Sequence, residues 1–325
     1  MTKKLKITII AVIIVLLLTA IAGLIKYNAL FAAPQKQAEP ERFIVPLNAA
    51  EQDIIQNLLE QGFIKSKWGF KYALGKTEIQ PGGYKIAKNM NAWKIAEILV
   101  NEPYMKWVII PEGLRKEEIG EILAEELGWN EEQKNDWTNR YTAMQFDYFE
   151  GVYFPDTYLM PKDETGLQIA QRFIDKFNEK FALYADKFIK ENIKWTTALK
   201  IASIVQREAA GKNDMPLIAG ILWNRLLRGM KLEVDATVQY ARGKTENGWW
   251  SPIKPEDKAI DSPYNTYLYK GLPPHPIANP GIDAIDAVLN SAETECLYYL
   301  HDEDGKIHCA KTYEEHLKNI EQFLQ

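Results

Sequence analysis

The chain has 325 residues, of which 46% are hydrophobic and 26% are charged, and its net charge is −5. These proportions are those of an ordinary globular protein, and the length suffices for about two domains. Four lysines are the only charges up to Lys26, so the remainder of the chain has a net charge of −9. Phosphate binding requires a concentrated basic surface, so this charge balance argues against a nucleic-acid partner.

The first apolar segment is long enough to cross a membrane. Residues 7–25 are 19 consecutive residues without a charge, close to the roughly 20 that span a hydrocarbon core. A cleaved signal peptide is the alternative, although its apolar region usually has about 7 to 15 residues. Lysines before the segment predict that residues 1–6 are cytoplasmic. We therefore expect a single-pass protein of the cell (inner) membrane, with a stalk at 26–41 and an extracytoplasmic remainder.

Residues 42–130 alternate between short strands and short helices. The helical segments "IAEIL" at 95–99 and "IGEIL" at 119–123 echo one another. Each follows a turn that contains glycine, which indicates small βα units. This arrangement resembles the LysM-like module, a fold that binds N-acetylated glycan chains. A plain structural αβ subdomain is the alternative that the residues leave open.

Residues 131–325 predict a larger, mixed α+β domain, so the whole chain is of the α+β class. Its first part is mostly helical and is interrupted by "FEGVYFPDTYLMP", whose prolines favour a loop or an edge strand. A helix ends at Glu208, and the next helix begins after Asp214, a suitable N-cap. Residues 230–285 predict loops that line a groove.

Cys296 and Cys309 flank "LYYLHDEDGKIH", which predicts two short strands joined by a turn at Asp304 and Gly305. An exported domain permits a disulfide between them. The geometry of a disulfide is restrictive, so we expect free buried thiols. An amphipathic helix over "YEEHLKNIEQFLQ" closes the chain.

The same end of the chain holds three of the histidines, at His301, His308 and His316. Their spacing, with that of the two cysteines, matches no zinc signature. We expect neither a metal nor a cofactor.

"IASIVQREAA", residues 201–210, predicts an amphipathic helix that carries one misplaced charge. At 100° per residue, Glu208 falls on the apolar side, between Ile201 and Ile204, whereas Gln206 falls on the opposite, outward side. Burial raises the pKa of a carboxyl group, and a general acid that acts on a glycosidic oxygen must hold its proton near neutral pH. The alternative is that the helix frays at Glu208 and the charge reaches solvent.

Aromatic and short polar side chains are frequent between residues 235 and 267. Aromatic faces suit the apolar sides of pyranose rings, and polar side chains suit their hydroxyl groups. Surface loops of any protein contain such residues, so this observation alone only suggests a sugar site. The members of the set are Asp235, Thr237, Tyr240, Tyr264, Asn265, Thr266 and Tyr267.

Several blocks resemble, in the expected order, the signature blocks of the endolytic murein transglycosylases, or YceG-like family. They are "PEGLR", "EGVYFPDTY", "IASIVQREAA", "GILWNRLLRGMKLEVDATVQYARG", "SPYNTYLYKGLPPHPIANPG" and "GKIHCAKTYEEHLKNI". The resemblance covers nearly the whole chain from about residue 42.

The resemblance implies cleavage of peptidoglycan between N-acetylmuramic acid and N-acetylglucosamine, with a 1,6-anhydromuramyl end as product. Glu208 matches the catalytic glutamate, which acts first as general acid and then as base. The implied partners are peptidoglycan strands and, beyond them, peptidoglycan synthases and division proteins. By matching position, the implied cleft residues are Asp235, Thr237, Tyr264, Asn265 and Thr266, with Asn224 and Tyr240 as their support.

The chain departs from the family pattern at Gln206, Ala209 and His275, where an acid, a hydroxyl residue and a glycine are usual. None of these changes removes Glu208. Asp235 has two interpretations: it is a second carboxylate that contacts substrate, or it caps the loop after Gly229.

Two other functions stay open. A glycan-binding scaffold without catalysis needs only the residues before about 130. A hydrolase of lysozyme type, in which a second carboxylate such as Asp235 takes part, would leave reducing muramyl ends. Anhydromuramyl and reducing ends differ in mass by one water.

Overall fold

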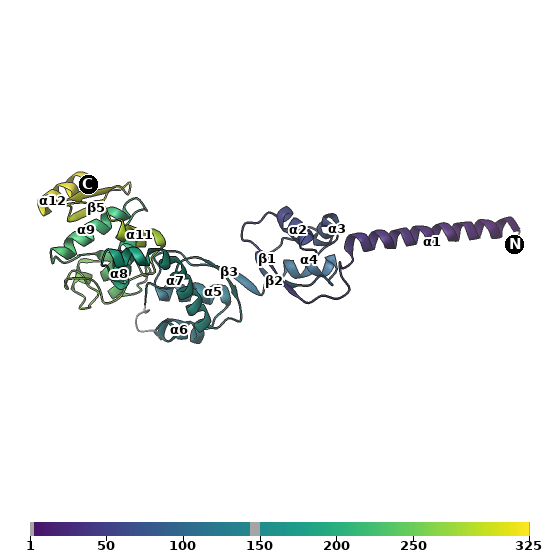
Figure 1. The fold of residues 1–325 in the computed structure, drawn as a ribbon, viewed down its shortest axis with the longest axis horizontal. Helices are drawn as coiled ribbons and strands as arrows, with labels where there is room; N and C mark the ends of the chain where they lie inside the picture. Colours follow the sequence, from purple (N-terminus) through teal and green to yellow (C-terminus); the bar gives the residue numbers. More distant parts are fainter. Residues whose placement is uncertain (1–2, 144–149, 325) are drawn as a thin grey trace. The chain divides into compact units, whose positions relative to one another are not determined.

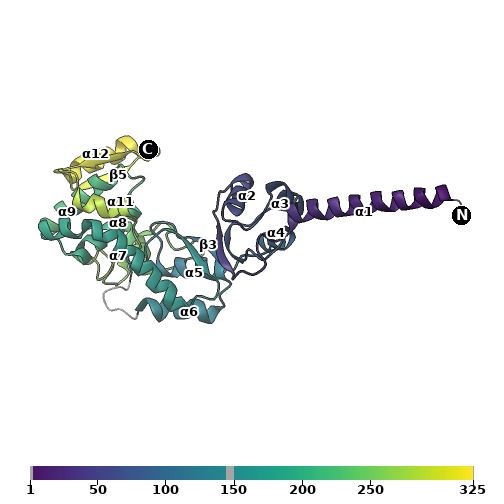
Figure 2. The ribbon, with the colours of Figure 1, turned by 45° about the vertical axis from the view of Figure 1, so that its right-hand side comes forward.

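A computed structural model describes residues 3–143 and 150–324 (Figure 1). The chain forms two compact units. The first unit comprises Met1–Val108 and Tyr158–Asp163, and the second comprises Ile109–Thr157 and Glu164–Gln325. Residues 109–130 therefore belong to the second unit. Helices and strands are mixed in both units (Figure 2), as expected for the α+β class.

Helix α1, Lys3–Phe31, extends the predicted apolar segment by several residues at its carboxyl end. Within it, Leu5–Phe31 is long and apolar enough to cross a membrane, with a mean hydropathy of 3.0 in its most apolar part. A membrane anchor and a signal sequence both satisfy this criterion. The last turn of α1 packs into the first unit, where Phe31 is a buried core residue.

The first unit is a four-stranded sheet with three short helices. The strands, in the order β1-β2-β3-β4, are Glu41–Val45, Gly82–Ile86, Met105–Ile109 and Thr157–Pro161. Phe43 of β1 lies opposite Tyr84 of β2 in an antiparallel pair. The helices are α2 (Glu51–Glu60), α3 (Lys67–Leu74) and α4 (Ala92–Val100). Their apolar sides share one core with Phe43 and Tyr84, because short amphipathic elements are stable only when such sides pack together.

The second unit is largely helical. Its helices are α5 (Lys116–Leu127), α6 (Glu131–Asn139), η1 (Tyr141–Ala143), α7 (Gly166–Lys190), α8 (Trp195–Glu208), α9 (Met215–Leu227), α10 (Asp235–Arg242), η2 (Pro255–Ala259), α11 (Ile282–Leu289) and α12 (Tyr313–Phe323). Helix α8 contacts α7, α9, α10 and α11. Its residues from Ala198 to Val205, apart from Lys200, are buried, so α8 is the central helix of this unit.

The predicted hairpin is confirmed. Strands β5 (Tyr298–His301) and β6 (Ile307–Ala310) pair antiparallel, and Gly305 supplies the positive φ of their turn. The expectation of free thiols is wrong, because Cys296 and Cys309 form a disulfide. Backbone pairing continues beyond β5, where the Leu297 amide donates to Ala310. This register brings the two cysteine Cα atoms within 5.9 Å, a separation that a disulfide can bridge.

A close backbone crossing on α9 generates a stability prediction. A Cβ atom on Gly220 would lie 2.3 Å from the carbonyl oxygen of Ala292, which is backbone and cannot turn aside. Gly220→Ala should lower the free energy of unfolding by about 1–3 kcal/mol through overpacking. Thermal unfolding in detergent micelles, followed by circular dichroism, measures the change.

The matched control is Gly211→Ala, because a Cβ atom there meets no atom within 4 Å. This variant should melt within about a degree of the wild type, since surface substitutions usually change stability by less than about 0.5 kcal/mol. Equal melting temperatures for the two variants would contradict the prediction.

Candidate active site

A pocket of about 450 Å³ lies in the second unit, where the end of α8 faces the hairpin and α12. Its lining combines carboxylates, basic groups and aromatic rings, which suits a polar ligand with flat apolar faces. The lining residues are Glu208, Arg225, Leu232, Glu233, Asp235, Lys258, Tyr267, Tyr298, Tyr299, Tyr313 and His316.

Glu208 is the last residue of α8, and its carboxylate is held in this pocket. The helix continues regularly to that point, because the Ala209 amide still donates to Val205. The Tyr299 hydroxyl donates to Glu208 Oε2 at 2.7 Å, and the Ala236 amide approaches Oε1 at 3.5 Å. Burial raises the pKa of Glu208, while the hydrogen bonds from Tyr299 and Ala236 lower it and nearby Asp235 raises it. The net direction is upward, which favours the protonated acid.

The opposite side of α8 is covered by residues 277–281. Ser203 Oγ accepts a hydrogen bond from the Ile277 amide at 3.0 Å, and Gln206 Oε1 accepts one from the Gly281 amide at 2.9 Å. Gln206 thus does not simply face outward, as the helical periodicity predicted. The reason is tertiary: a segment about 75 residues away in sequence packs on that side. Helix α8 is therefore held from two sides, and Glu208 at its end is positioned by both.

Asp235 is the first residue of α10, and the structure places it in the same pocket as Glu208. Its Oδ1 accepts a hydrogen bond from the Tyr267 hydroxyl at 2.6 Å. Burial raises the pKa of Tyr267, and the bond to Asp235 raises it further. The ammonium group of Lys258 lies 4.2 Å from the centre of the Tyr267 ring, so the two side chains form one wall of the pocket.

Thr237 and Thr266 are buried behind the pocket lining. Their hydroxyl oxygens are 2.8 Å apart. Thr266 Oγ1 also accepts from the Val234 amide, and Thr237 Oγ1 donates to the Val234 carbonyl. The structure uses both hydroxyls to join the start of α10 to the loop that carries Tyr267.

Asn265 and Asn224 also make internal bonds. The Asn265 side-chain amide donates to the carbonyls of Lys258 and Ile260. That of Asn224 donates to the carbonyls of Thr294 and Cys296. Both asparagines fix loops that border the pocket, and neither is among the lining residues.

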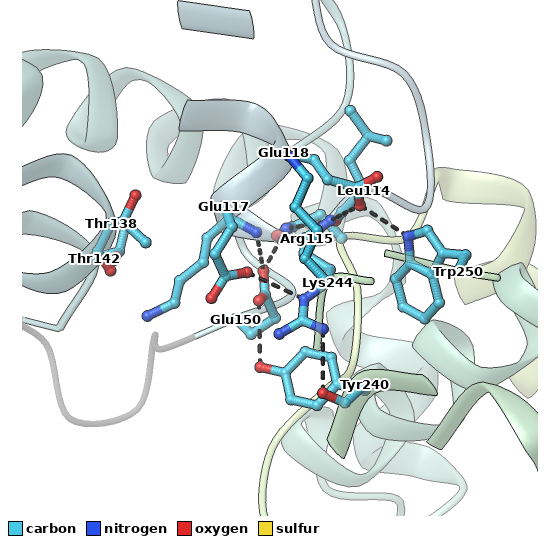
Figure 3. A network of polar contacts seen from close by, with 12 residues as sticks. Leu114, Arg115, Glu117, Glu118, Thr138, Thr142, Glu150, Tyr240, Lys244 and Trp250 are labelled. Atoms are coloured by element: carbon cyan, nitrogen blue, oxygen red, sulfur yellow. Dashed lines mark hydrogen bonds and ion pairs between the residues drawn. The ribbon is translucent and has the colours of Figure 1, made fainter. Parts of the chain in front are cut away.

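Tyr240 lies in a second polar cluster, around Glu150 (Figure 3), and Tyr264 packs against Tyr240. The two rings are 4.7 Å apart, and the Arg115 guanidinium stacks 4.1 Å from the Tyr240 ring. The Tyr240 hydroxyl approaches Glu150 Oε2 at 3.5 Å. These two tyrosines are outside the lining of the Glu208 pocket, so the structure divides the predicted set between two places.

Glu150 is 1% exposed. Its Oε1 accepts from the side chain of Asn279 at 2.6 Å and from the Lys116 amide at 3.1 Å. Burial raises the pKa of Glu150 to about 8, and the charge of Glu117 adds to the effect, while Lys116 and Arg115 oppose it. Glu150 is therefore largely protonated at neutral pH and acts as a hydrogen-bonding group inside the second unit.

Arg225 and Tyr299 are pocket residues that the sequence did not reveal. Arg225 is 7% exposed and donates to the carbonyls of Leu297 and Leu232 and to the carboxylate of Glu233. It ties α9 to the hairpin that carries Tyr299. A single arginine within the apolar "GILWNRLL" run was the available signal, since a buried guanidinium needs several acceptors.

The histidines near the C-terminus have separate partners. His301 Nε2 lies 3.2 Å from Asp214, and His308 Nε2 lies 2.7 Å from Asp302. His316 lines the Glu208 pocket and stacks on Tyr298. Among residues 3–143 and 150–324, no three His, Cys, Asp or Glu side chains are grouped to hold a metal.

Comparison with known proteins gives the class. The model of the YceG-like family matches residues 43–322, and the chain belongs to this family. It is 30% identical to a Bacillus subtilis protein named endolytic murein transglycosylase, over 86% of this chain and 84% of that protein.

A Streptococcus pneumoniae protein of the same name is 28% identical over 85% of this chain, which spans 57% of that longer protein. The crystal structure of a YceG-like protein from Listeria monocytogenes has a TM-score of 0.61 and 26% identity. The structural match covers 87% of this chain and 99% of the Listeria monocytogenes chain.

The raised pKa of Glu150 predicts that the stability of the protein depends on pH. Its folded pKa of about 8 exceeds the ordinary value of 4.5, so the folded state binds the proton more tightly, and stability falls as pH rises between these values. From pH 6 to pH 8 the loss should approach 2–3 kcal/mol, at about 1.4 kcal/mol per pH unit. Glu150→Gln keeps the acceptor oxygen without titrating, so its melting temperature should fall less over this range. Parallel melting profiles would contradict this account.

Proposed function

We propose that this protein is a membrane-anchored endolytic murein transglycosylase with Glu208 as its catalytic residue. The observation that carries the proposal is the Glu208 carboxyl, whose pKa burial raises within a pocket lined by tyrosines. The relatives named endolytic murein transglycosylase support the same activity. The substrate is then the glycan strand of peptidoglycan.

The reaction needs only one acid. Protonated Glu208 donates its proton to the glycosidic oxygen as the bond from that oxygen to C1 of N-acetylmuramic acid breaks. The C6 hydroxyl of the same sugar closes on C1, and its proton passes to the Glu208 carboxylate, which restores the acid. No water is consumed, and the product is a 1,6-anhydromuramyl end. A hydrolase needs a second carboxylate to activate water or to attack C1, but here the substrate supplies the nucleophile.

The neighbours of Glu208 suit both halves of this cycle. Burial favours the protonated form that begins the reaction. The hydroxyl of Tyr299 and the amide of Ala236 then stabilise the carboxylate that forms when the proton leaves. Asp235, held by Tyr267, supplies negative charge in the same pocket, where positive charge develops on the sugar ring.

The other predicted substrate residues have a supporting part in this proposal. Thr237, Thr266, Asn265 and Asn224 hold the loops that border the pocket. Tyr240 and Tyr264 belong to the neighbouring Glu150 cluster. We propose that substrate contacts are made instead by the lining residues Asp235, Tyr267, Tyr298 and Tyr313.

Anchoring follows from α1. We propose that this helix spans the cell membrane with residues 1–6 in the cytoplasm and the two units outside. We also propose that the segment expected as a domain at 42–130 is LysM-like and binds glycan, with its last part, 109–130, packed in the second unit. The remainder, 131–325, is then the catalytic part and carries the Glu208 pocket. Peptidoglycan synthases and division proteins are its predicted protein partners.

Glu208→Gln tests the central claim. Loss of a general acid typically costs about 10²–10⁴ in rate, so release of anhydromuramyl products from purified sacculi should fall by at least about 100-fold. Glu303→Gln, in an exposed turn, is the matched control and should digest at the wild-type rate. Mass spectrometry of the products gives both rate and chemistry.

Two outcomes would contradict the proposal. Unchanged digestion by Glu208→Gln would remove Glu208 from the mechanism. Products with reducing muramyl ends, heavier by one water, would show a hydrolase, and the presence of Asp235 in the pocket would then identify the second carboxylate.

Tyr299→Phe should shift the pH profile of the reaction. The first step needs protonated Glu208, so the rate falls as pH rises through its pKa. The hydrogen bond from Tyr299 lowers that pKa, and its removal should move the falling limb to higher pH. Initial rates of anhydromuramyl release between about pH 5 and 9 measure the limb. Tyr313→Phe removes a pocket hydroxyl without that bond and should leave the limb in place. If the falling limb of Tyr299→Phe stays at the wild-type pH or moves to lower pH, this role of Tyr299 is contradicted.

A further inference from the structure

Five aromatic rings gather in the first unit around the carboxyl end of α1. Phe31 is the centre, with ring centroids at 5.1 Å from Tyr27, 5.9 Å from Tyr72 and 5.4 Å from Trp93. Trp68 stacks on Tyr72 at 5.7 Å. Phe31 itself is buried, but Trp68 is 64%, Tyr72 61% and Trp93 41% exposed. We call these five residues the aromatic collar.

The core of the unit does not account for this exposure. In α3, Phe70 and Leu74 face the core, whereas Trp68 and Tyr72, four residues apart, share the outer side. In α4, Ile95 and Leu99 are buried and Trp93 is outside. Helix α3 thus has a second apolar side, and α4 adds the exposed ring of Trp93 beside it. Contiguous exposed apolar surface of this kind marks a binding site.

The collar is held rigidly against α1. A Cβ atom on Gly69 of α3 would lie 2.2 Å from the carbonyl oxygen of Leu30, so the two helices touch through their backbones. Helix α4 also contacts α1. The rings therefore keep one height relative to the apolar helix.

This inference rests on α1 being the membrane anchor. The aromatic collar then lies at the level of the lipid headgroups. Residues 7–25 carry no charge and suffice for the hydrocarbon core. Phe31 follows Lys26 by five residues, or about 7.5 Å of helix. The headgroup layer on each side of a bilayer is roughly 5–7 Å thick. By these lengths Phe31 lies at the outer edge of the headgroup layer, and Tyr27, four residues nearer the core, lies within that layer.

The side chains have the chemistry of that layer. Tryptophan and tyrosine are the residues enriched at membrane interfaces, because an apolar ring and a polar tip match the boundary. Exposed lysines accompany them on and beside α3, at Lys65, Lys67 and Lys76, while Lys71 pairs with Glu51. Such lysines attract anionic headgroups.

We propose that the aromatic collar is a lipid-binding surface that docks the first unit onto the outer face of the bilayer. Trp68, Tyr72 and Trp93 insert among the headgroups beside α1. The first unit then lies on the membrane surface, where α1 spans the bilayer and the exposed rings of α3 and α4 contact the headgroups.

The test uses the full chain reconstituted into phosphatidylcholine and phosphatidylglycerol vesicles, with or without bromine on the acyl chains near the headgroup. Bromine quenches tryptophan emission only at short range. None of the nine tryptophans is in α1. Quenching of the wild-type emission by lipid should therefore come through Trp68 and Trp93. In Trp68→Phe/Trp93→Phe the quenched fraction should fall at least fivefold. Trp129→Phe/Trp223→Phe, which removes two tryptophans of the second unit, should keep it.

Flotation with the vesicles separates the possible failures. A wild type that floats but is not quenched would overturn the lipid surface alone and indicate that water or another protein covers the collar. A wild type that does not float would overturn the anchor and, with it, this inference. Quenching that persists in the Trp68→Phe/Trp93→Phe variant would place the lipid contact elsewhere and also overturn it.

Discussion

The buried contact between Asn279 and Glu150 is the constraint on which the second unit depends. The Asn279 side chain donates to Glu150 and accepts from the amides of Gly151 and Tyr153, while its backbone bonds to Gly113 and Leu114. One amide thereby joins three segments that lie up to about 165 residues apart in sequence. A buried polar group must be fully bonded, so these segments have one mutual arrangement. Residues 277 and 281, beside Asn279, hold α8 through Ser203 and Gln206, and the place of Glu208 follows.

Glu150, which is buried, and Glu208, which is partly buried, show how different surroundings give the same carboxyl group two roles. Burial raises the pKa of both. Glu150 is 1% exposed and accepts hydrogen bonds from Asn279 and the Lys116 amide, so its carboxyl group stabilises the fold. Glu208 ends a helix at the edge of a pocket and has one hydroxyl and one amide to stabilise its charge. An acid that must release and recover a proton needs this second kind of setting.

In the first unit, two helices have one side in the core and an aromatic side that is exposed. Helices α3 and α4 bury one side in the core and expose tryptophan or tyrosine on the other. Because α3 touches α1 through Gly69, the aromatic side is tied to the end of the apolar helix. The end of α1 is thus part of a folded unit, which limits the freedom that a stalk beginning at residue 26 would have had.

The sequence by itself determined the features that depend on local pattern. Hydropathy located the apolar helix, helical periodicity ended α8 at Glu208, and a glycine turn defined the hairpin. Only the tertiary structure decided that Cys296 and Cys309 pair, that Gln206 is covered, and that Tyr240 contacts Glu150. It also brought Tyr299 to Glu208 across 91 residues of chain. Periodicity reports which side of an element is apolar, but not which distant segment packs there, because that choice depends on the whole set of buried contacts.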